Sequence, residues 1–150
     1  MHIAYRPASE GDFARCTEIR GLTSDNAISR SELAAIGVTP ETWKPRLRTG
    51  SYTGFVAEAD GVVIGFSFGD TGNGEVLVLA VLAGYEGRGI GRELLALITT
   101  KLLASGHREL WLAASATPDV RSYGFYRRVG WTPTATYDDN GDEILVYRDR

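Results

Sequence analysis

The hydrophobic positions in the middle of this chain follow patterns typical of strands. At 52–59 (YTGFVAEA) and 62–70 (VVIGFSFGD), short apolar stretches flank the pair Asp60-Gly61. An Asp-Gly pair accepts the positive φ angles of a two-residue hairpin turn. The next stretch, 75–82 (EVLVLAVL), is apolar at nearly every position, which predicts a strand buried on both faces. We therefore expect three consecutive strands here.

The stretch 91–106 (GRELLALITTKLLASG) changes to the spacing of an amphipathic helix that Gly106 ends. Its apolar positions are Leu94, Leu95, Ile98, Leu102 and Leu103. Because these positions repeat every three or four residues, one face of this helix should lie on the sheet.

Three helix starts are predicted in the first third of the chain. Ser9, with Asp12 three residues later, is typical of an N-cap before a helix that ends near residue 20. The segment 29–37 (SRSELAAIG) predicts a short helix. Thr39 followed by Pro40 predicts another, with Pro40 at its first position. Pro45 should trim or kink that last helix.

The remaining segments complete an α/β pattern. The stretches 2–7 and 108–115 predict strands, Asp119 to Val129 predicts a helix, and 131–149 predicts a hairpin around Asn140-Gly141. The resulting order is β-α-α-β-β-β-α-β-α-β-β. Because several neighbouring strands are joined by hairpins and others by helices, we expect a mixed, mainly antiparallel sheet.

Composition narrows the classes of protein. With 150 residues, 43% apolar and 23% charged, the chain fits one soluble globular domain over 1–150. No apolar run approaches the roughly 20 residues of a membrane span, and no secretory signal is visible. Cys16 is the single cysteine, which favours a cytoplasmic location. A formal charge of −3, without a basic stripe, argues against nucleic acid. Two histidines and one cysteine argue against a structural zinc site.

The glycine-rich stretch AVLAGYEGRGIGREL, at 80–94, joins the apolar strand to the amphipathic helix. Backbone N–H groups at such a junction lie at the positive end of the helix dipole and form an anion site, most often for phosphate. A P-loop needs Lys and Ser or Thr after its last glycine, and these are missing here. The dinucleotide fingerprint fails as well, because Arg92 or Leu94 stands where its third glycine belongs.

The segment from Glu75 to Leu95 resembles the acetyl-CoA-binding core of the GCN5-related N-acetyltransferases (GNAT family). That family has Gln or Arg, two residues, Gly, one residue, and Gly or Ala; Glu86, Gly89 and Gly91 stand at these positions, with Glu86 as a departure. The resemblance implies the GNAT fold, with about seven strands and four helices, and acetyl-CoA as co-substrate. It also implies that the pyrophosphate is cradled by Gly87, Arg88, Gly89, Ile90, Gly91 and Arg92. The pantetheine arm would pair with the strand edge at Leu79, Ala80 and Val81.

Two side chains are candidate catalytic groups by the same resemblance. Tyr126, in YGFYRRVGW, matches the family's tyrosine that acts as general acid toward the departing sulfur; the alternative is a core tyrosine. Glu75 matches the catalytic glutamate of the histone-acetylating branch, with a solvated strand end as the alternative. The backbone N–H of Val81 is the expected donor to the oxyanion. Asp119 stands where relatives often carry a cofactor-contacting Asn, and it is also the expected N-cap of its helix.

The sequence therefore predicts direct acetyl transfer to a primary amine of a small molecule or peptide, with a non-catalytic acyl-CoA-binding or sensing module as the alternative. We expect no nucleic-acid, membrane or metal partner, and relatives suggest a homodimer. The acceptor region comprises 21–50 and the final turn. Four acidic residues of that turn could hold a cationic amine, or could simply be solvated. They are Asp138, Asp139, Asp142 and Glu143.

Overall fold

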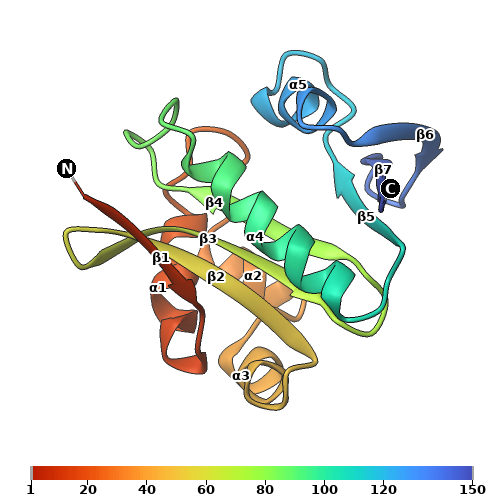
Figure 1. Ribbon diagram of the computed structural model, residues 1–150. Coiled ribbons are helices and arrows are strands. Elements are labelled where there is room, and N and C mark those ends of the chain that lie inside the picture. The colour runs from red at the N-terminus through yellow and green to blue at the C-terminus, as the bar shows by residue number, and fades with distance from the viewer. Residues whose placement is uncertain (1, 150) are drawn as a thin grey trace.

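Residues 2–149 are described by the computed structural model, and they form seven strands, five α-helices and one short 3-10 helix (Figure 1). The strands are β1 (Ile3–Pro7), β2 (Tyr52–Ala59), β3 (Val62–Asp70), β4 (Val76–Val81), β5 (Glu109–Ala114), β6 (Thr132–Tyr137) and β7 (Glu143–Arg148). The helices are η1 (Glu10–Asp12), α1 (Phe13–Arg20), α2 (Arg30–Ala35), α3 (Pro40–Thr49), α4 (Ile90–Ala104) and α5 (Arg121–Arg128). The predicted α/β class and the seven strands are confirmed.

The strands are divided between two sheets. One has the order β1-β2-β3-β4 and the other the order β5-β7-β6, and within both sheets the described neighbours are antiparallel. Among residues 2–149, one parallel bridge, Glu75 to Trp111, joins the first sheet to the second. The parallel component of the predicted mixed sheet is therefore confined to this one contact.

Several local predictions are confirmed. Ala59 pairs with Val62 across the hairpin turn, where Asp60 has a φ of 50° and Gly61 a φ of 85°. Both angles are positive, as a two-residue type I′ turn requires. The Thr39 side chain accepts the N–H of Thr42 at the start of α3.

The predicted effect of Pro45 is partly wrong, because α3 continues through this residue to Thr49. Asp119 is also not the N-cap of α5, since Val120 occupies that position and no side chain caps the helix there. Instead, the first N–H of the helix, on Arg121, donates to the carboxylate of Asp25, which lies between α1 and α2, at 3.4 Å.

The four-stranded sheet carries helices on both faces. On one face, Ile90 and Leu94 of α4 pack with Ala57 and Ile64. On the other face, Cys16 and Ile19 of α1 pack in one cluster with strand residues of β2, β3 and β4, so Cys16 is a core residue. The sheet is thus the middle layer of three (Figure 1).

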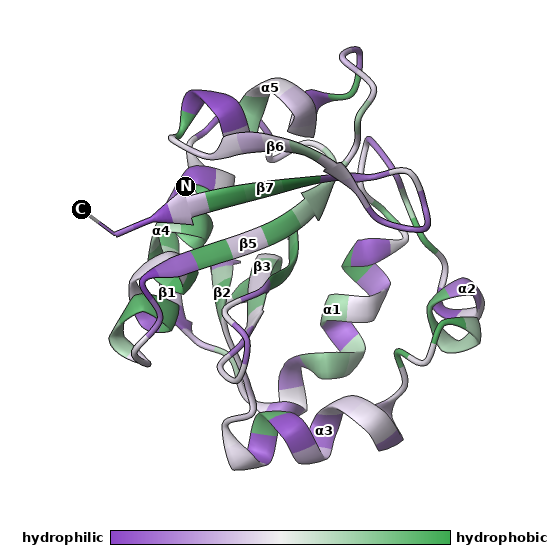
Figure 2. Ribbon diagram, turned by 90° about the vertical axis from the view of Figure 1, so that its right-hand side faces the viewer, coloured by the Kyte–Doolittle hydropathy of each residue, from purple (hydrophilic) through white to green (hydrophobic). Residues whose placement is uncertain are grey.

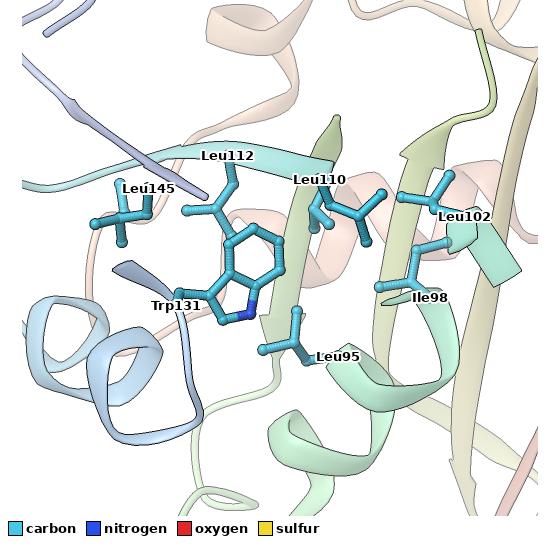
Figure 3. Close-up of a cluster of buried hydrophobic side chains, with 9 residues drawn as sticks. Leu95, Ile98, Leu102, Leu110, Leu112, Trp131 and Leu145 are labelled. Atoms are coloured by element: carbon cyan, nitrogen blue, oxygen red, sulfur yellow. The ribbon is translucent and has the colours of Figure 1, made fainter. Parts of the chain in front are cut away.

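Helix α4 also supports the second sheet. Leu95, Ile98 and Leu102 meet side chains of β5, β7 and the segment after α5. Figure 3 shows these side chains in one cluster with the indole of Trp131, and Figure 2 shows hydrophobic positions along the paired strands β5 and β7. Helix α4 therefore packs against both sheets.

Strand β4 is less buried than predicted. Val76 and Ala80 are buried, but Leu77, Val78, Leu79 and Val81 keep partial exposure. The reason is that β4 is the edge of its sheet and faces a cleft. No helix within residues 2–149 is long and apolar enough to cross a membrane.

Candidate active site

The main cleft lies where the two sheets diverge. At one end of β4 the strands touch, because Glu75 bridges Trp111 and the Trp111 N–H donates to the carbonyl of Gly74 at 3.2 Å. Beyond this point β4 and β5 pair with other strands, and a cleft of about 440 Å³ opens between them. All of β4 and the end of β5 with Ser115 line it.

Strand β4 turns unused backbone groups toward the cleft. The N–H of Leu82 donates to the carbonyl of Ile64 at 2.8 Å, and Ala80 lies opposite Phe66 in the same register. Because hydrogen-bonding direction alternates along an antiparallel strand, the groups of Ala80 face β3, whereas those of Leu79 and Val81 point away from it. Of the three strand residues predicted to meet the pantetheine arm, Leu79 and Val81 thus have backbone groups to offer.

The glycine loop forms the next part of the wall. Gly87 and Gly89 have φ angles of 76° and 79°, and a Cβ at either position would meet nothing within 4 Å. Gly89 is the N-cap of α4, so the N–H groups of the first turn have no helical partner. Five of the predicted loop residues line the cleft: Gly87, Gly89, Ile90, Gly91 and Arg92. The arrangement suits an anion at the positive end of α4.

Arg88 differs from its loop neighbours. It is absent from the cleft wall, and its guanidinium carbon lies 5.7 Å from the centre of the Tyr85 ring. A cation over an aromatic face is attracted by the ring quadrupole. The side chain of Arg88 thus contacts Tyr85 and does not itself line the cleft, which leaves its backbone N–H as its contribution to the predicted cradle.

Glu86 ties the glycine loop to the segment after α1. Its carboxylate accepts the hydroxyl of Ser24 at 2.5 Å and the N–H of Gly84 at 3.2 Å. The Ser24 hydrogen bond lowers the pKa of Glu86, so the group carries its charge at neutral pH. The departure from Gln or Arg at this position thus has a structural use.

The segment 23–26, after α1, lines the cleft. Besides the Ser24 bond, the carbonyl of Leu22 accepts the N–H of Ala83 at 3.3 Å on one side. On the other side Asp25 accepts the N–H of Arg121 at 3.4 Å. The segment therefore contacts both the β4–α4 connection and α5.

Tyr126 lies where the sequence places it, on α5 and in the wall of the cleft. Its ring packs edge-on against Phe125 and Trp131, with centroids 5.2 Å and 6.3 Å away. Burial raises the pKa of Tyr126 to about 12, although Arg20 acts in the opposite direction. Within residues 2–149 its hydroxyl has no hydrogen-bond partner. Tyr126 is therefore a protonated donor available to a ligand.

Glu75, unlike Tyr126, is not part of the cleft wall. It sits at the closed end of the cleft. Its N–H donates to the side chain of Asn73 and its carbonyl accepts the N–H of Asp70, both at 2.9 Å. Burial, followed by the charge of Asp70, raises the pKa of Glu75. The raised pKa of Glu75 would suit a general base, but the residue does not line the cleft.

The cleft wall includes Arg20, which the sequence did not single out, and Asp142, which it predicted as a candidate for holding a cationic amine. Arg20 lies at the end of α1, and it becomes part of the cleft wall only because α1 packs against β4. Asp142 was one of four acidic residues in the last turn, and within that set it is the one that lines the cleft. Glu143 pairs with Arg127, and Asp138 accepts turn N–H groups, so both have structural partners.

Within the described residues, no group of three or more His, Cys, Asp or Glu side chains could hold a metal ion. Besides backbone N–H groups and the Tyr126 hydroxyl, the cleft wall holds the charged side chains of Arg20, Asp25, Glu86, Arg92, Arg121, Arg128 and Asp142.

The comparisons of this chain with known proteins all find acetyltransferases. The profile of the Acetyltransferase (GNAT) family matches residues 16–131. MJ1530, an uncharacterized N-acetyltransferase of Methanocaldococcus jannaschii, is 31% identical over 100 residues, which cover 63% of this chain and 64% of that protein. The chain thus matches slightly less than two thirds of this relative.

Two solved structures share the fold. The paia N-acetyltransferase from Thermoplasma acidophilum, in complex with coenzyme A, has a TM-score of 0.80 at 21% identity, over 99% of this chain and 100% of that one. The yncA protein of Salmonella typhimurium, with its cofactor acetyl-CoA, has a TM-score of 0.73 at 19% identity, over 100% and 96%. Since the matched region 16–131 contains β4, the glycine loop and α5, the chain belongs to the Acetyltransferase (GNAT) family.

Proposed function

We propose that this protein is an acetyl-CoA-dependent N-acetyltransferase that transfers acetyl directly to a primary amine of a small molecule or peptide. One observation carries the proposal: a single cleft joins the N-terminus of α4, the open edge of β4 and the hydroxyl of Tyr126. These three features suit a diphosphate, an extended amide-containing arm and a departing sulfur, in that order along one ligand.

The diphosphate would be held by backbone N–H groups from Gly87 to Arg92. Charge-assisted hydrogen bonds of this kind are about twice as strong as neutral ones. The two amides of a pantetheine arm would pair with Leu79 and Val81 as an added strand does. Solved relatives hold coenzyme A or acetyl-CoA, which supports this use of the cleft.

Acetyl-CoA, when bound, supplies a thioester carbonyl to be attacked by the amine. The N–H of Val81 points into the cleft and would donate to the oxygen that becomes negative. Tyr126 would donate a hydrogen bond to the departing sulfur. A phenol with a pKa of about 12 gives up its proton to a thiolate with a pKa near 8.5 only at a cost. Its contribution is therefore a hydrogen bond that stabilises the leaving group rather than a completed proton transfer.

The amine has to be neutral before it attacks. Since Glu75 does not line the cleft, it could deprotonate the amine only through intervening water. An α-amine, which titrates near 7.7–8.0 in peptides, needs such help less than a lysine side chain, which titrates near 10.4. The acceptor ammonium would therefore lose its proton to water rather than directly to Glu75.

Calorimetry with acetyl-CoA tests the proposal directly. We expect one site per chain, and competition by coenzyme A. No heat at millimolar cofactor would contradict it. The second measurement is release of the coenzyme A thiol across polyamines, amino acids, aminoglycosides and peptide N-termini. Binding without thiol release over this whole set would favour a non-catalytic acyl-CoA-binding module instead.

A further inference from the structure

A second cavity opens beside the cleft, and its wall is apolar. It has a volume of about 170 Å³ and lies between α1, α2, α3 and the strands β3 and β4. Its aromatic wall residues are Phe13, Trp43, Phe66 and Phe68, and Ile28 and Leu33 are among the aliphatic ones. It shares Arg20, Leu77 and Val78 with the main cleft, so the two spaces adjoin. A cavity of about 150 Å³ accommodates a benzene molecule, so this one has room for a leucine, methionine or phenylalanine side chain.

Arg20 stands where the two cavities meet, and it is the one charged residue among the described residues that line the apolar cavity. Its guanidinium donates to the carbonyl of Asn26 at 2.5 Å. No carboxylate between residues 2 and 149 lies within ion-pair distance of it. Other partly buried arginines are paired: Arg6 with Asp12, and Arg127 with Glu143. Because Arg20 is half-buried and desolvated, a carboxylate that reached it would gain more than one at an exposed site.

Asp142 supplies the opposite charge from another element. It belongs to the turn between β6 and β7 and lines the main cleft. Its N–H donates to the Asp138 side chain and its carbonyl accepts the Asp138 N–H, both at 2.9 Å, so its backbone is fixed. No cation in the described part of the chain pairs with its carboxylate, and it does not pair with Arg20.

We propose that the acceptor is a free α-amino acid with an apolar side chain. Its carboxylate pairs with Arg20, its side chain fills the apolar cavity, and its amino group lies on the cleft side, where Asp142 attracts the ammonium form. This assignment rests on the proposed function and names the acceptor class for the same site. It excludes lysine side chains, because the cavity would bury a charge without a partner. It also disfavours peptide N-termini, which have no carboxylate for Arg20.

The transfer balances without a further reactant. The ammonium group loses one proton to solvent, and its nitrogen then bonds to the acetyl carbon as the carbon–sulfur bond breaks. The nitrogen releases a second proton, and the departing sulfur takes up one. The products are the N-acetyl amino acid, free coenzyme A and one proton.

The test compares L-leucine with L-leucinamide, which differ only at the carboxylate. Thiol release is measured for both with the parent protein and with Arg20→Gln and Arg20→Lys. We expect a kcat/KM for leucine about 10- to 100-fold above that for leucinamide in the parent. Arg20→Gln should bring this ratio close to one, and Arg20→Lys should restore part of it. Because the ratio is compared between variants, the lower basicity of leucinamide cancels.

Arg15→Gln is the matched control. Arg15 lies on the same helix, but it bonds the carbonyl of Val63 and pairs with Glu18, away from both cavities. The leucine to leucinamide ratio should be the same in Arg15→Gln as in the parent. Glycine, which cannot fill the apolar cavity, should be at least about 10-fold poorer than leucine.

A binding measurement gives a second readout. Because Trp43 lines the apolar cavity, L-leucine added to the protein with coenzyme A should change the tryptophan emission, and Trp43→Phe should remove that change. Calorimetry with acetyl-CoA shows whether each variant is folded and keeps its cofactor site.

Three results would overturn the proposal. They are a parent that uses leucinamide, polyamines or peptides as well as leucine, a leucine to leucinamide ratio unaltered in Arg20→Gln, or leucine binding without any response from Trp43. In each case acetyl-CoA binding and turnover of another amine would leave the proposed function intact. A protein that binds no acetyl-CoA would overturn both.

Discussion

The glycine loop provides the sharpest test of the cofactor site, because adding one methyl group separates folding from binding. Gly87→Ala and Gly89→Ala place a Cβ at φ angles of 76° and 79°. Neither Cβ would meet an atom of the protein within 4 Å. The folded protein therefore suffers only the backbone penalty, whereas a diphosphate lying against the loop would meet the new methyl group.

The two costs can be estimated separately. Placing a non-glycine residue in the left-handed region costs about 1–2 kcal/mol. For a chain of this length that corresponds to a fall in Tm of about 2–8 °C. Loss of one hydrogen bond to a charged ligand costs about 1.5–3 kcal/mol, or about 10- to 150-fold in Kd. Binding should thus fall far more than the change in stability explains.

Gly84→Ala is the matched control. Gly84 lies on the same connection at a φ of 95°, a Cβ there would also meet nothing within 4 Å, and it does not line the cleft. Gly91→Ala is a second control, because its Cβ would make ordinary contacts of 3.7 Å with Val81 and 3.9 Å with Phe125. Gly84→Ala should lower Tm and keep the parent Kd for coenzyme A, and Gly91→Ala should keep Tm.

The assays are thermal unfolding without ligand and calorimetry with coenzyme A. The reasoning is refuted if Gly87→Ala and Gly89→Ala bind coenzyme A as tightly as Gly84→Ala does at equal loss of Tm. In that event the loop would be an open turn, and the diphosphate would have to lie elsewhere.

Four further predictions concern the rest of the cleft. Tyr126→Phe should lower kcat about 10- to 100-fold with little change in the Kd of acetyl-CoA; an unchanged kcat would remove Tyr126 from the mechanism. Since burial raises the pKa of Tyr126 to about 12, its hydroxyl stays protonated and should cause no loss of kcat between pH 6 and about 10. Glu86→Gln removes a negative charge from the cleft wall and should tighten coenzyme A binding about 2- to 5-fold in calorimetry at low salt, a gain that 0.5 M salt should remove. Coenzyme A should slow amide hydrogen exchange at Leu79 and Val81 but not at Ala80, which β3 already protects; equal protection of all three would contradict the strand-like pairing.

The sequence predicted well those features that neighbouring residues determine. Asp60-Gly61 sets its turn through two adjacent φ angles, and Thr39-Pro40 starts α3 through a side-chain bond three residues away. The placement of the glycine loop between β4 and the start of α4 belongs to the same group, because the residues that end the strand and begin the helix are close in sequence. In each case a local conformational preference is strong enough to be visible without the fold.

The features that were missed depend on distant contacts. Asp119 has the right chemistry for an N-cap, but the first N–H of α5 is taken by Asp25, far away in sequence. Arg20 resembles any charged residue at a helix end until α1 packs under β4 beside an apolar cavity. The position of Glu75 relative to the cleft depends on where the two sheets touch, and the hydrophobic periodicity of the sequence does not predict that contact.

The contacts at the closed end of the cleft, where β4 and β5 touch, keep the backbone groups of β4 accessible to a ligand at the open end. At the closed end the Trp111 indole N–H donates to the carbonyl of Asn73 at 3.2 Å, and the His107 ring bonds the carbonyl of Thr71 at 2.6 Å. Gly74 lies between these contacts at a φ of 78°, and a Cβ there would approach the Glu109 carbonyl to 3.2 Å. Because α4 packs against both sheets, the strands cannot close further along their length. The backbone groups of β4 are thus held apart from β5 before any ligand arrives, and binding needs little ordering of the protein.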